Sequence, residues 1–367
     1  MLPASQGGVK KKMDEMDPWK VRDGNKKDLK GILFLRKIVF GETERDKLDD
    51  RFWKWEFENG PDGGGFLYIV EDANKIVGHF ADIPRRFSVQ GEVVLGTLSL
   101  DLMVHPDYWR KGIFAAMGKY GALRVKQQNG LFMTAFPIRQ ETIQGLKKIG
   151  WKGVVELPVL VYPIRFSGII NRYLRFLPLS LLVGGVARFF YFFLFGWRKK
   201  EEIKGVEIKR VRELDEKFDL FWEKVISLHR IMGVRDRNYL NWRYLQHPTR
   251  TYEIYGAFQK EEMKGYIVLR KVELLNFNSA VIVDLLALDE VTLAALVEKG
   301  IQHSRQVGAD LLGFMVPQNH LYYQIPRKRG FLPSFKTFLF MIYSHSDKEI
   351  FLSPEKWYVN WGDSDVI

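Results

Sequence analysis

The sequence predicts an α+β protein in which one unit occurs twice. Each unit is expected to be a mixed twisted sheet flanked by helices, and an apolar helical linker joins the two. Three observations support this: an internal repeat, the same order of elements in both halves, and a composition of 46% hydrophobic and 27% charged residues, typical of globular proteins. The 367 residues suffice for two domains of ordinary size.

The repeat consists of like residues at a slowly drifting offset. Trp55 and Trp242 are 187 residues apart, and Asp101 and Asp284 are 183 apart. Small loop insertions and deletions would produce such a drift, so the ordered series indicates a duplication. The other pairs are Phe57 and Tyr244, Pro61 and Pro248, Gly78 and Gly265, Leu131 and Leu311, Pro137 and Pro317, and Gly150 and Gly330.

Both halves show the same order of elements. A helix and a Trp-x-aromatic segment come first, apolar strands with alternation follow, and then a long helix, a strand, a short helix and a last strand. Antiparallel strands followed by strand–helix–strand predict a mixed sheet. The first-half strands are expected at 66–71, 76–80, 93–104 and 131–137, with the long helix at 112–129. The second-half strands are expected at 252–258, 265–270, 280–288, 311–317 and 335–343, with the helix at 291–306.

These patterns set the expected domain boundaries. A loose N-terminal tail without the apolar run of a secretion signal comes first, and a C-terminal tail ends the chain. The five segments are the tail 1–19, the first domain 20–163, the linker 164–202, the second domain 203–345 and the tail 346–367.

The linker contains an unusually apolar run, Phe176–Trp197, and residues 166–200 include six basic and no acidic residues. Its length could span a bilayer, but one span would separate the two halves. Pro178 and Gly184-Gly185 are expected to break the run into two short helices. Two interpretations remain open. Either 166–200 is a buried connector, or it places a cytoplasmic protein in peripheral contact with an anionic membrane at its inner face.

The net charge of +12 and pI of about 9.5 suit nucleic acid, anionic lipid or an anionic cofactor. A recognition-helix motif and an ordered aromatic–basic platform are both missing, so no nucleic-acid partner is expected. The chain has no cysteine, which excludes disulfides, thiol nucleophiles and Cys-ligated zinc. Its histidines lack the spacing of metal ligands, and we predict no metal.

The most specific local motif follows the strand that ends at Val104. A turn carries Pro106 and Asp107, and Arg110-Lys111-Gly112 opens a helix. Strand, basic turn and helix together can bind a phosphate group, because unpaired N–H groups and the positive end of the helix dipole face the anion. Gly112 lets the backbone approach such a ligand. The alternative is an ordinary turn with a solvated basic pair.

This stretch resembles the GNAT family of N-acetyltransferases, most of all its bacterial two-domain members. The resemblance rests on Val104–Tyr108, Arg110–Phe114, Phe136-Pro137 and Gly150-Trp151, and covers 20–163 and, more weakly, 203–345. It implies that the first half binds acetyl-coenzyme A (acetyl-CoA) as co-substrate. The pyrophosphate would lie on the amides of Arg110, Lys111, Gly112, Ile113, Phe114 and Ala115, and the pantetheine arm along Leu102, Met103 and Val104.

The resemblance further implies acyl-CoA-dependent N-acyl transfer, with acetyl passing to the amine of a small molecule or amino sugar. Trp109 and Phe114 depart from the family's loop motif. Family members also place an Asn and then a Tyr after the strand equivalent to 131–137, and the first half has neither. The second half has Asn319 and Tyr323, but its helix opens with Asp289-Glu290, which would repel pyrophosphate. The second half is therefore interpreted as a degenerate copy.

Acetyl transfer needs a base for the ammonium and stabilisation of the thioester oxygen. Asp363 and Asp365 are considered although their tail is expected to be solvated. A non-catalytic acyl-CoA-binding protein of the same fold is the alternative function. The catalytic candidates are Glu92, Asp101, His105, Tyr323, Asp363 and Asp365.

Overall fold

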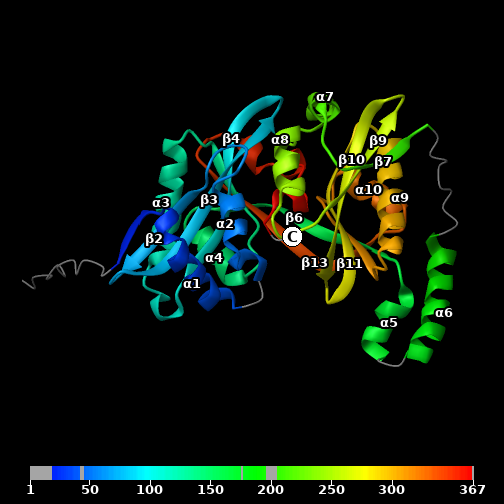
Figure 1. Ribbon diagram of the computed structural model, residues 1–367, viewed down its shortest axis with the longest axis horizontal. Coiled ribbons are helices and arrows are strands. Elements are labelled where there is room, and N and C mark those ends of the chain that lie inside the picture. The colour runs from blue at the N-terminus through cyan, green and yellow to red at the C-terminus, as the bar shows by residue number, and fades with distance from the viewer. Residues whose placement is uncertain (1–18, 42–44, 175–176, 196–204, 366–367) are drawn as a thin grey trace, which may run out of the picture.

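One 13-stranded mixed sheet runs through the molecule (Figure 1). The protein is described by a computed structural model, which covers residues 19–41, 45–174, 177–195 and 205–365. The predicted mixed sheet with flanking helices is confirmed. The expected N-terminal tail, except Trp19, lies outside the described residues. The strands are β1 (Lys20–Asp23), β2 (Phe66–Asp72), β3 (Lys75–Val89), β4 (Glu92–Val104), β5 (Phe132–Ala135), β6 (Lys152–Pro163), β7 (Glu207–Val211), β8 (Ile231–Gly233), β9 (Glu253–Gln259), β10 (Glu262–Leu274), β11 (Phe277–Ala287), β12 (Leu311–Met315) and β13 (Leu332–Ser344).

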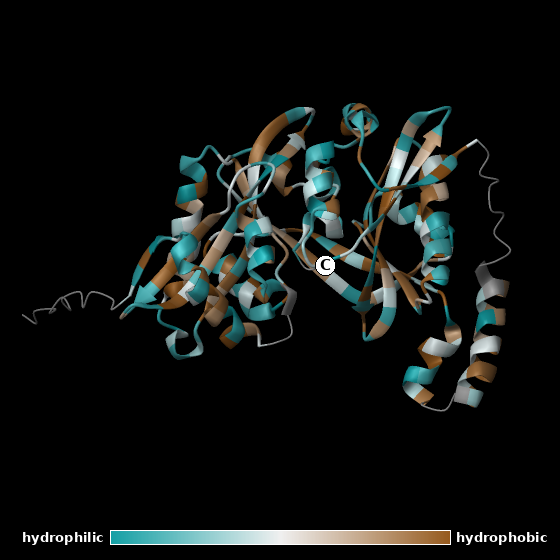
Figure 2. Cartoon of the chain, in the orientation of Figure 1, coloured by the Kyte–Doolittle hydropathy of each residue, from teal (hydrophilic) through white to brown (hydrophobic). Residues whose placement is uncertain are grey.

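Helices of the two halves cover corresponding strands. Helix α3 packs on β2, β3 and β4, and α9 packs on β10 and β11. Apolar side chains line these contacts, and Figure 2 shows hydrophobic residues along the central strands. The α-helices are α1 (Leu29–Phe40), α2 (Asp50–Phe57), α3 (Ile113–Gln127), α4 (Gln140–Lys148), α5 (Phe166–Leu174), α6 (Leu177–Phe195), α7 (Glu216–Val225), α8 (Arg237–Leu240), α9 (Glu290–Gln306) and α10 (Leu321–Lys328).

The centre of the sheet is an exchange of strands between the halves. The order is β1-β2-β3-β4-β5-β13-β6-β12-β11-β10-β9-β7, with β8 on the edge of β3. Strand β13, late in the second half, pairs with β5 of the first half, and β6 of the first half pairs with β12 of the second. β13 and β6 also pair with each other. Each half therefore completes the sheet of the other.

The repeated tryptophans meet at the junction of the halves. The rings of Trp55 and Trp242 stack with centroids 4.6 Å apart and planes 13° apart. Trp55 Nε1 donates to the Trp242 carbonyl at 2.8 Å, and Trp242 Nε1 donates to the Trp55 carbonyl at 3.0 Å. Such a reciprocal contact is what a two-fold axis produces in a homodimer. One cluster of buried side chains contains residues of both halves, so the hydrophobic core continues across the junction.

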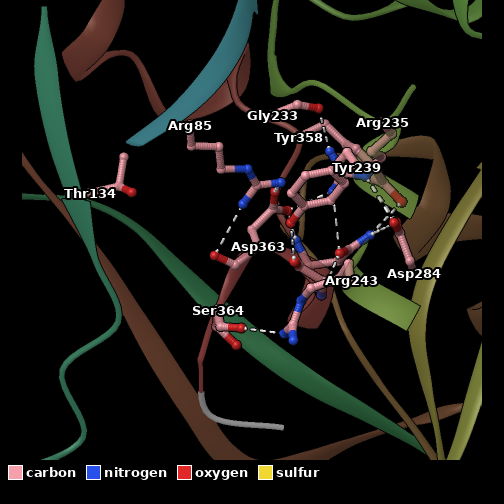
Figure 3. Close-up of polar contacts among 12 residues, drawn as sticks. Arg85, Thr134, Gly233, Arg235, Tyr239, Arg243, Asp284, Tyr358, Asp363 and Ser364 are labelled. Carbon is pink, nitrogen blue, oxygen red and sulfur yellow. Dashed lines mark hydrogen bonds and ion pairs between the residues drawn. The ribbon is translucent and has the colours of Figure 1, made fainter. Parts of the chain in front are cut away.

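The C-terminal tail is buried, although the sequence favours a solvated end. Asp363 accepts ion pairs from Arg85 and Arg235, each at 2.7 Å, and Arg235 also pairs with Asp284 at 3.0 Å. Figure 3 shows Asp363 between the two guanidinium groups. Burial raises the pKa of Asp363, but the two arginines outweigh burial and lower this pKa below its ordinary value. The tail is thus held by charges from both halves.

The apolar segment after β6 forms two helices, α5 and α6, which pack against each other. The sequence predicts a break at Pro178 and Gly184-Gly185, but α6 is continuous through all three residues. Pro178 lies in the first turn, where its missing N–H has no helical partner to lose. Gly184 faces α5 so closely that a Cβ there would lie 2.8 Å from the Ser167 nitrogen. Helix packing, and not flexibility, accounts for this glycine.

We expect Trp242→Ala to lower the free energy of unfolding by about 3–5 kcal/mol. The substitution removes the buried Trp242 ring, its stacking contact with Trp55, and the hydrogen bond from Trp242 Nε1 to the Trp55 carbonyl. Denaturant unfolding followed by circular dichroism measures the change. Phe335→Ala, at a side chain that is 90% exposed, is the control and should change stability by less than about 0.5 kcal/mol. Equal losses in both variants would contradict the role given to the tryptophan pair.

Candidate functional site

A cavity of about 590 Å³ opens where β4 and β5 diverge. The two strands pair in parallel at Thr97–Met133 and Leu98–Thr134, and the residues beyond these pairs line the cavity. On its other edge β5 stays paired with β13 through Ala135, whereas its pairing with β4 ends at Leu98–Thr134. The lining residues from β4 and from the end of β5 are Ser99, Leu100, Asp101, Leu102, Ala135, Phe136, Pro137, Ile138 and Arg139.

The opposite wall comes from the second half and from the tail. Arg250, Arg270, Val272 and Glu273 line it, together with Asp365. Lys47 and the end of α1 complete the rim. Both basic and acidic groups therefore face the same space, and the cavity is built from both halves of the chain.

A buried carboxyl group lies directly behind the cavity wall. Asp82 on β3 is opposite Ser99 of β4 in the sheet register, and it accepts hydrogen bonds from the Ser99 and Thr97 hydroxyls. Burial raises the pKa of Asp82 to about 6, and these hydrogen bonds offset part of the increase. Sequence reasoning missed this residue. Its one signal was a lone charge within the apolar strand His79-Phe80-Ala81-Asp82.

Two ion pairs lie at the edge of the same cavity. Asp101 is buried against the Arg36 guanidinium, and Lys47 Nζ lies 3.3 Å from Asp365 Oδ2. Arg36 also donates to the Lys47 carbonyl at 2.9 Å, so the two pairs are linked. Asp101 has a positive φ of 57° at an irregularity of the β3–β4 register. This bulge turns the strand next to the cavity.

The basic turn follows Val104, at the same C-terminal end of β4 as the cavity. Arg110 and Gly112 both have left-handed backbones, with φ of 65° and 79°, and Gly112 is the N-cap of α3. No side chain of the described residues caps this helix, and a Cβ on Gly112 would meet nothing within 4 Å. The amides at the start of α3 thus face open space, a geometry that can accept an anion. The residues present fit a pyrophosphate group.

Aromatic side chains shape the turn. Trp109 Nε1 donates to the Val104 carbonyl at 2.9 Å, and the Lys111 ammonium lies 4.3 Å from the centre of the Tyr108 ring. Phe114 points into the protein, because a Cβ on Gly145 of α4 would come within 2.7 Å of its ring. Trp109 and Phe114, the two departures from the family motif, therefore brace the turn without blocking Gly112.

The corresponding helix of the second half is already capped. The Asp289 side chain accepts from the Thr292 amide at 2.7 Å and from its hydroxyl at 3.0 Å. The carboxylate occupies the place that an anionic ligand would take. This helix start therefore does not offer the open amides seen at Gly112.

The structure brings some of the sequence candidates to the cavity and leaves others away from it. Asp101, Leu102 and Asp365 line it. Glu92 is exposed at the start of β4, about 30 Å along the strand from Asp101. The remaining candidates are held elsewhere. His105 caps the turn after β4, Tyr323 is half-buried on α10, and Asp363 is enclosed by its arginines.

A family model supports the resemblance found in the sequence. Residues 20–153 match the model of the GNAT acetyltransferase domain. No curated protein matches the chain by sequence.

Solved structures of the same fold include a GCN5-related N-acetyltransferase from Anabaena variabilis, with a TM-score of 0.63 and 12% identity over 88% of this chain and 72% of that one. A probable N-acyltransferase from Enterococcus faecalis has a TM-score of 0.62 and 15% identity, over 89% and 72%. N-myristoyltransferase from Saccharomyces cerevisiae, with bound myristoyl-CoA, has a TM-score of 0.56 and 11% identity, over 91% and 82%. The GNAT-like fold is thus shown.

We expect Asp82→Asn to become more stabilising, relative to the unchanged protein, as pH rises from 4 to 7. The pKa of Asp82 is raised from 3.8 to about 6 by folding, so the folded state binds the proton more tightly. The contribution of Asp82 to the free energy of unfolding is fully present below pH 4 and is lost as the pH rises through 6. The difference is about 3 kcal/mol. Unfolding by urea at several pH values measures it. Asp50→Asn, at a largely exposed carboxylate, is the control, and a parallel pH dependence of both variants would refute the assignment.

Proposed function

We propose that this chain is an acyl-CoA-dependent N-acyltransferase that moves acetyl from acetyl-CoA to the amine of a small molecule or amino sugar. The observation that carries the proposal is the pairing of two features on one strand. The open amides of the Gly112 turn lie beyond one end of β4, and the cavity lies beside Ser99–Leu102 of the same strand. An elongated cofactor with an anionic end and a reactive end suits this arrangement.

The cofactor would be held by the turn and by the strand. Pyrophosphate would accept from the backbone amides of Arg110 to Ala115, with the two basic side chains of the turn adding charge. Leu102, Met103 and Val104 would pair with the pantetheine arm as an added strand does. This assignment places the thioester next to the cavity, about two residues, or about 7 Å, along β4 from Val104.

We further propose that the chain is a tandem of two related domains with one active site. The repeat of Trp55 and Trp242, the exchange of β6 and β13, and the similar positions of α3 and α9 support this. The domains would be 20–163 and 203–345, with 164–202 as linker and 346–367 as tail. The first would bind the cofactor, and the second would supply the far wall, including Arg250, Arg270 and Glu273.

The chemistry requires an unprotonated amine. Its nitrogen attacks the thioester carbonyl, the N–C bond forms, the C–S bond breaks, and the thiolate leaves and takes up a proton. Asp82 and Ser99 offer a path for the proton that the amine must lose. Ser99 lines the cavity and its hydroxyl donates to Asp82, whose pKa of about 6 leaves it ionised at neutral pH. Asp101 and Asp365 remain further candidates on the cavity wall.

We expect Gly112→Asp to weaken acetyl-CoA binding by about 10- to 100-fold, because the carboxylate would repel pyrophosphate and close the backbone approach. Calorimetry with the full chain should show one acetyl-CoA per chain, since Asp289 already caps the other helix. Gly91→Asp is the matched control. Gly91 also has a positive φ, of 89°, and open space around a Cβ, but lies in the β3–β4 hairpin. Equal acetyl-CoA affinity of the two variants would show that the Gly112 turn does not bind the pyrophosphate.

We expect the full chain to release free thiol from acetyl-CoA in the presence of an acceptor amine. In the unchanged protein, kcat/KM should rise with pH through about 6 as Asp82 ionises. Asp82→Asn should lower kcat by about 100-fold and remove this limb of the profile. A panel of amines and amino sugars is the assay. Saturable acetyl-CoA binding without turnover on any amine would favour the non-catalytic acyl-CoA-binding alternative, and an unchanged profile would exclude Asp82 as the proton acceptor.

A further inference from the structure

The α5–α6 hairpin carries an apolar surface that the other described residues leave exposed. In Figure 1 it stands at one edge of the molecule, below α9 in this view. Its base is attached through the Arg165–Asp310 ion pair at 2.8 Å and through Tyr191, whose hydroxyl donates to the Gly330 carbonyl at 2.7 Å. Beyond these contacts, the described side chains of α6 are mostly exposed. The hairpin is therefore not the buried connector that one interpretation of the sequence predicts.

Helix α6 has the reverse of the pattern expected for a water-soluble helix. Small or polar residues, Ser180 and Gly184, are buried against α5. Large apolar side chains face away and are between 39% and 68% exposed. At 100° per residue, seven of these eight described side chains fall within one arc of about 120°. The seven are Leu179, Leu182, Val183, Val186, Phe189, Phe190 and Phe193, and the eighth, Leu181, lies about 140° from the centre of the arc.

The charges of the segment suit a negatively charged surface. Residues 166–200 contain six basic and no acidic residues. Arg188 lies about 160° around the helix from the centre of the apolar arc, so the arc and the charge occupy opposite faces. An apolar face with basic residues on the other side is the pattern of helices that lie in the plane of a bilayer interface. Among the described residues, no helix is long and apolar enough to cross a membrane.

A second copy of the chain fits this surface less well. A symmetric contact would place the same face of both copies together, and the basic residues of each would meet with no carboxylate from either segment to neutralise them. Anionic lipid supplies both an apolar phase and negative headgroups. We propose that the α5–α6 hairpin adsorbs to anionic lipid bilayers, with the arc from Leu179 to Phe193 buried in the headgroup–acyl boundary. This proposal is independent of the acyltransferase activity.

Flotation of the full chain with vesicles tests this binding. The protein should float with phosphatidylcholine–phosphatidylglycerol vesicles at low salt, and binding should weaken at high salt or with phosphatidylcholine alone. The double variant Leu182→Glu/Phe189→Glu should bind the anionic vesicles at least about 100-fold more weakly. Arg172→Gln, at an exposed residue of α5, should weaken binding about fivefold on anionic vesicles only. Phe335→Glu, at an exposed side chain of β13, is the matched control and should float like the unchanged protein.

Three outcomes would overturn the proposal. The unchanged chain could fail to float with either vesicle, or the double variant could float as well as the control. A chain that is dimeric by light scattering, and that Leu182→Glu/Phe189→Glu makes monomeric without any vesicle binding, would identify the surface as a contact between copies. Both substituted side chains are already exposed to water, so the variant should fold, and circular dichroism checks this. Acetyl-CoA calorimetry on the same variant separates a failure of this proposal from a failure of the proposed function.

Discussion

The pairing of β6 with β13 is the constraint on which the rest of the structure depends. Backbone N–H and C=O groups of a buried strand must find partners, and these two strands find theirs in each other and in the opposite half. As a result the two halves of the chain share one sheet, and one cluster of buried side chains contains residues of both. On its other edge β13 pairs with β5, whose pairing with β4 ends at Leu98, and the cavity lies beyond that point.

The exchange also decides which parts of the chain can act alone. The expected boundaries at 163 and 203 treat the halves as separable, but a fragment from 203 to 345 would lose β6, the neighbour of both β12 and β13. It would also expose Trp242, which stacks on Trp55. The cavity also depends on both halves, because Arg270 and Glu273 line it together with Ser99 and Asp101. The half that is proposed to bind the cofactor therefore depends on the other half, whose helix α9 has no open N-terminus.

The sequence predicted the local elements well and their long-range partners poorly. Alternating apolar residues located β2, β4, β9 and β11 to within a few residues, since that pattern is a local consequence of one buried face. Strand β3 was underestimated because Pro84, Arg85 and Arg86 look like loop residues. In the structure Arg85 pairs with Asp363, and Arg86 pairs with Asp62 and Asp236. No local pattern reveals partners that distant, and the burial of Asp363 and the exchange of β6 and β13 were missed for the same reason.

The buried charges near the junction are costly to desolvate, and most of them are arranged as arginine–aspartate pairs. Arg235 holds Asp284 and Asp363, while Arg36 holds Asp101. A buried aspartate with its arginine therefore lies beside the irregular part of both β4 and β11. Removing one partner of such a pair leaves a buried charge without a counter-charge, which is strongly destabilising. An apolar pair of the same size would carry no such desolvation cost. Asp82 differs because, among the described residues, it has hydroxyl donors and no ion pair, and burial raises its pKa. Of these carboxyl groups, Asp82 is therefore the one whose proton can be exchanged near neutral pH without disrupting an ion pair.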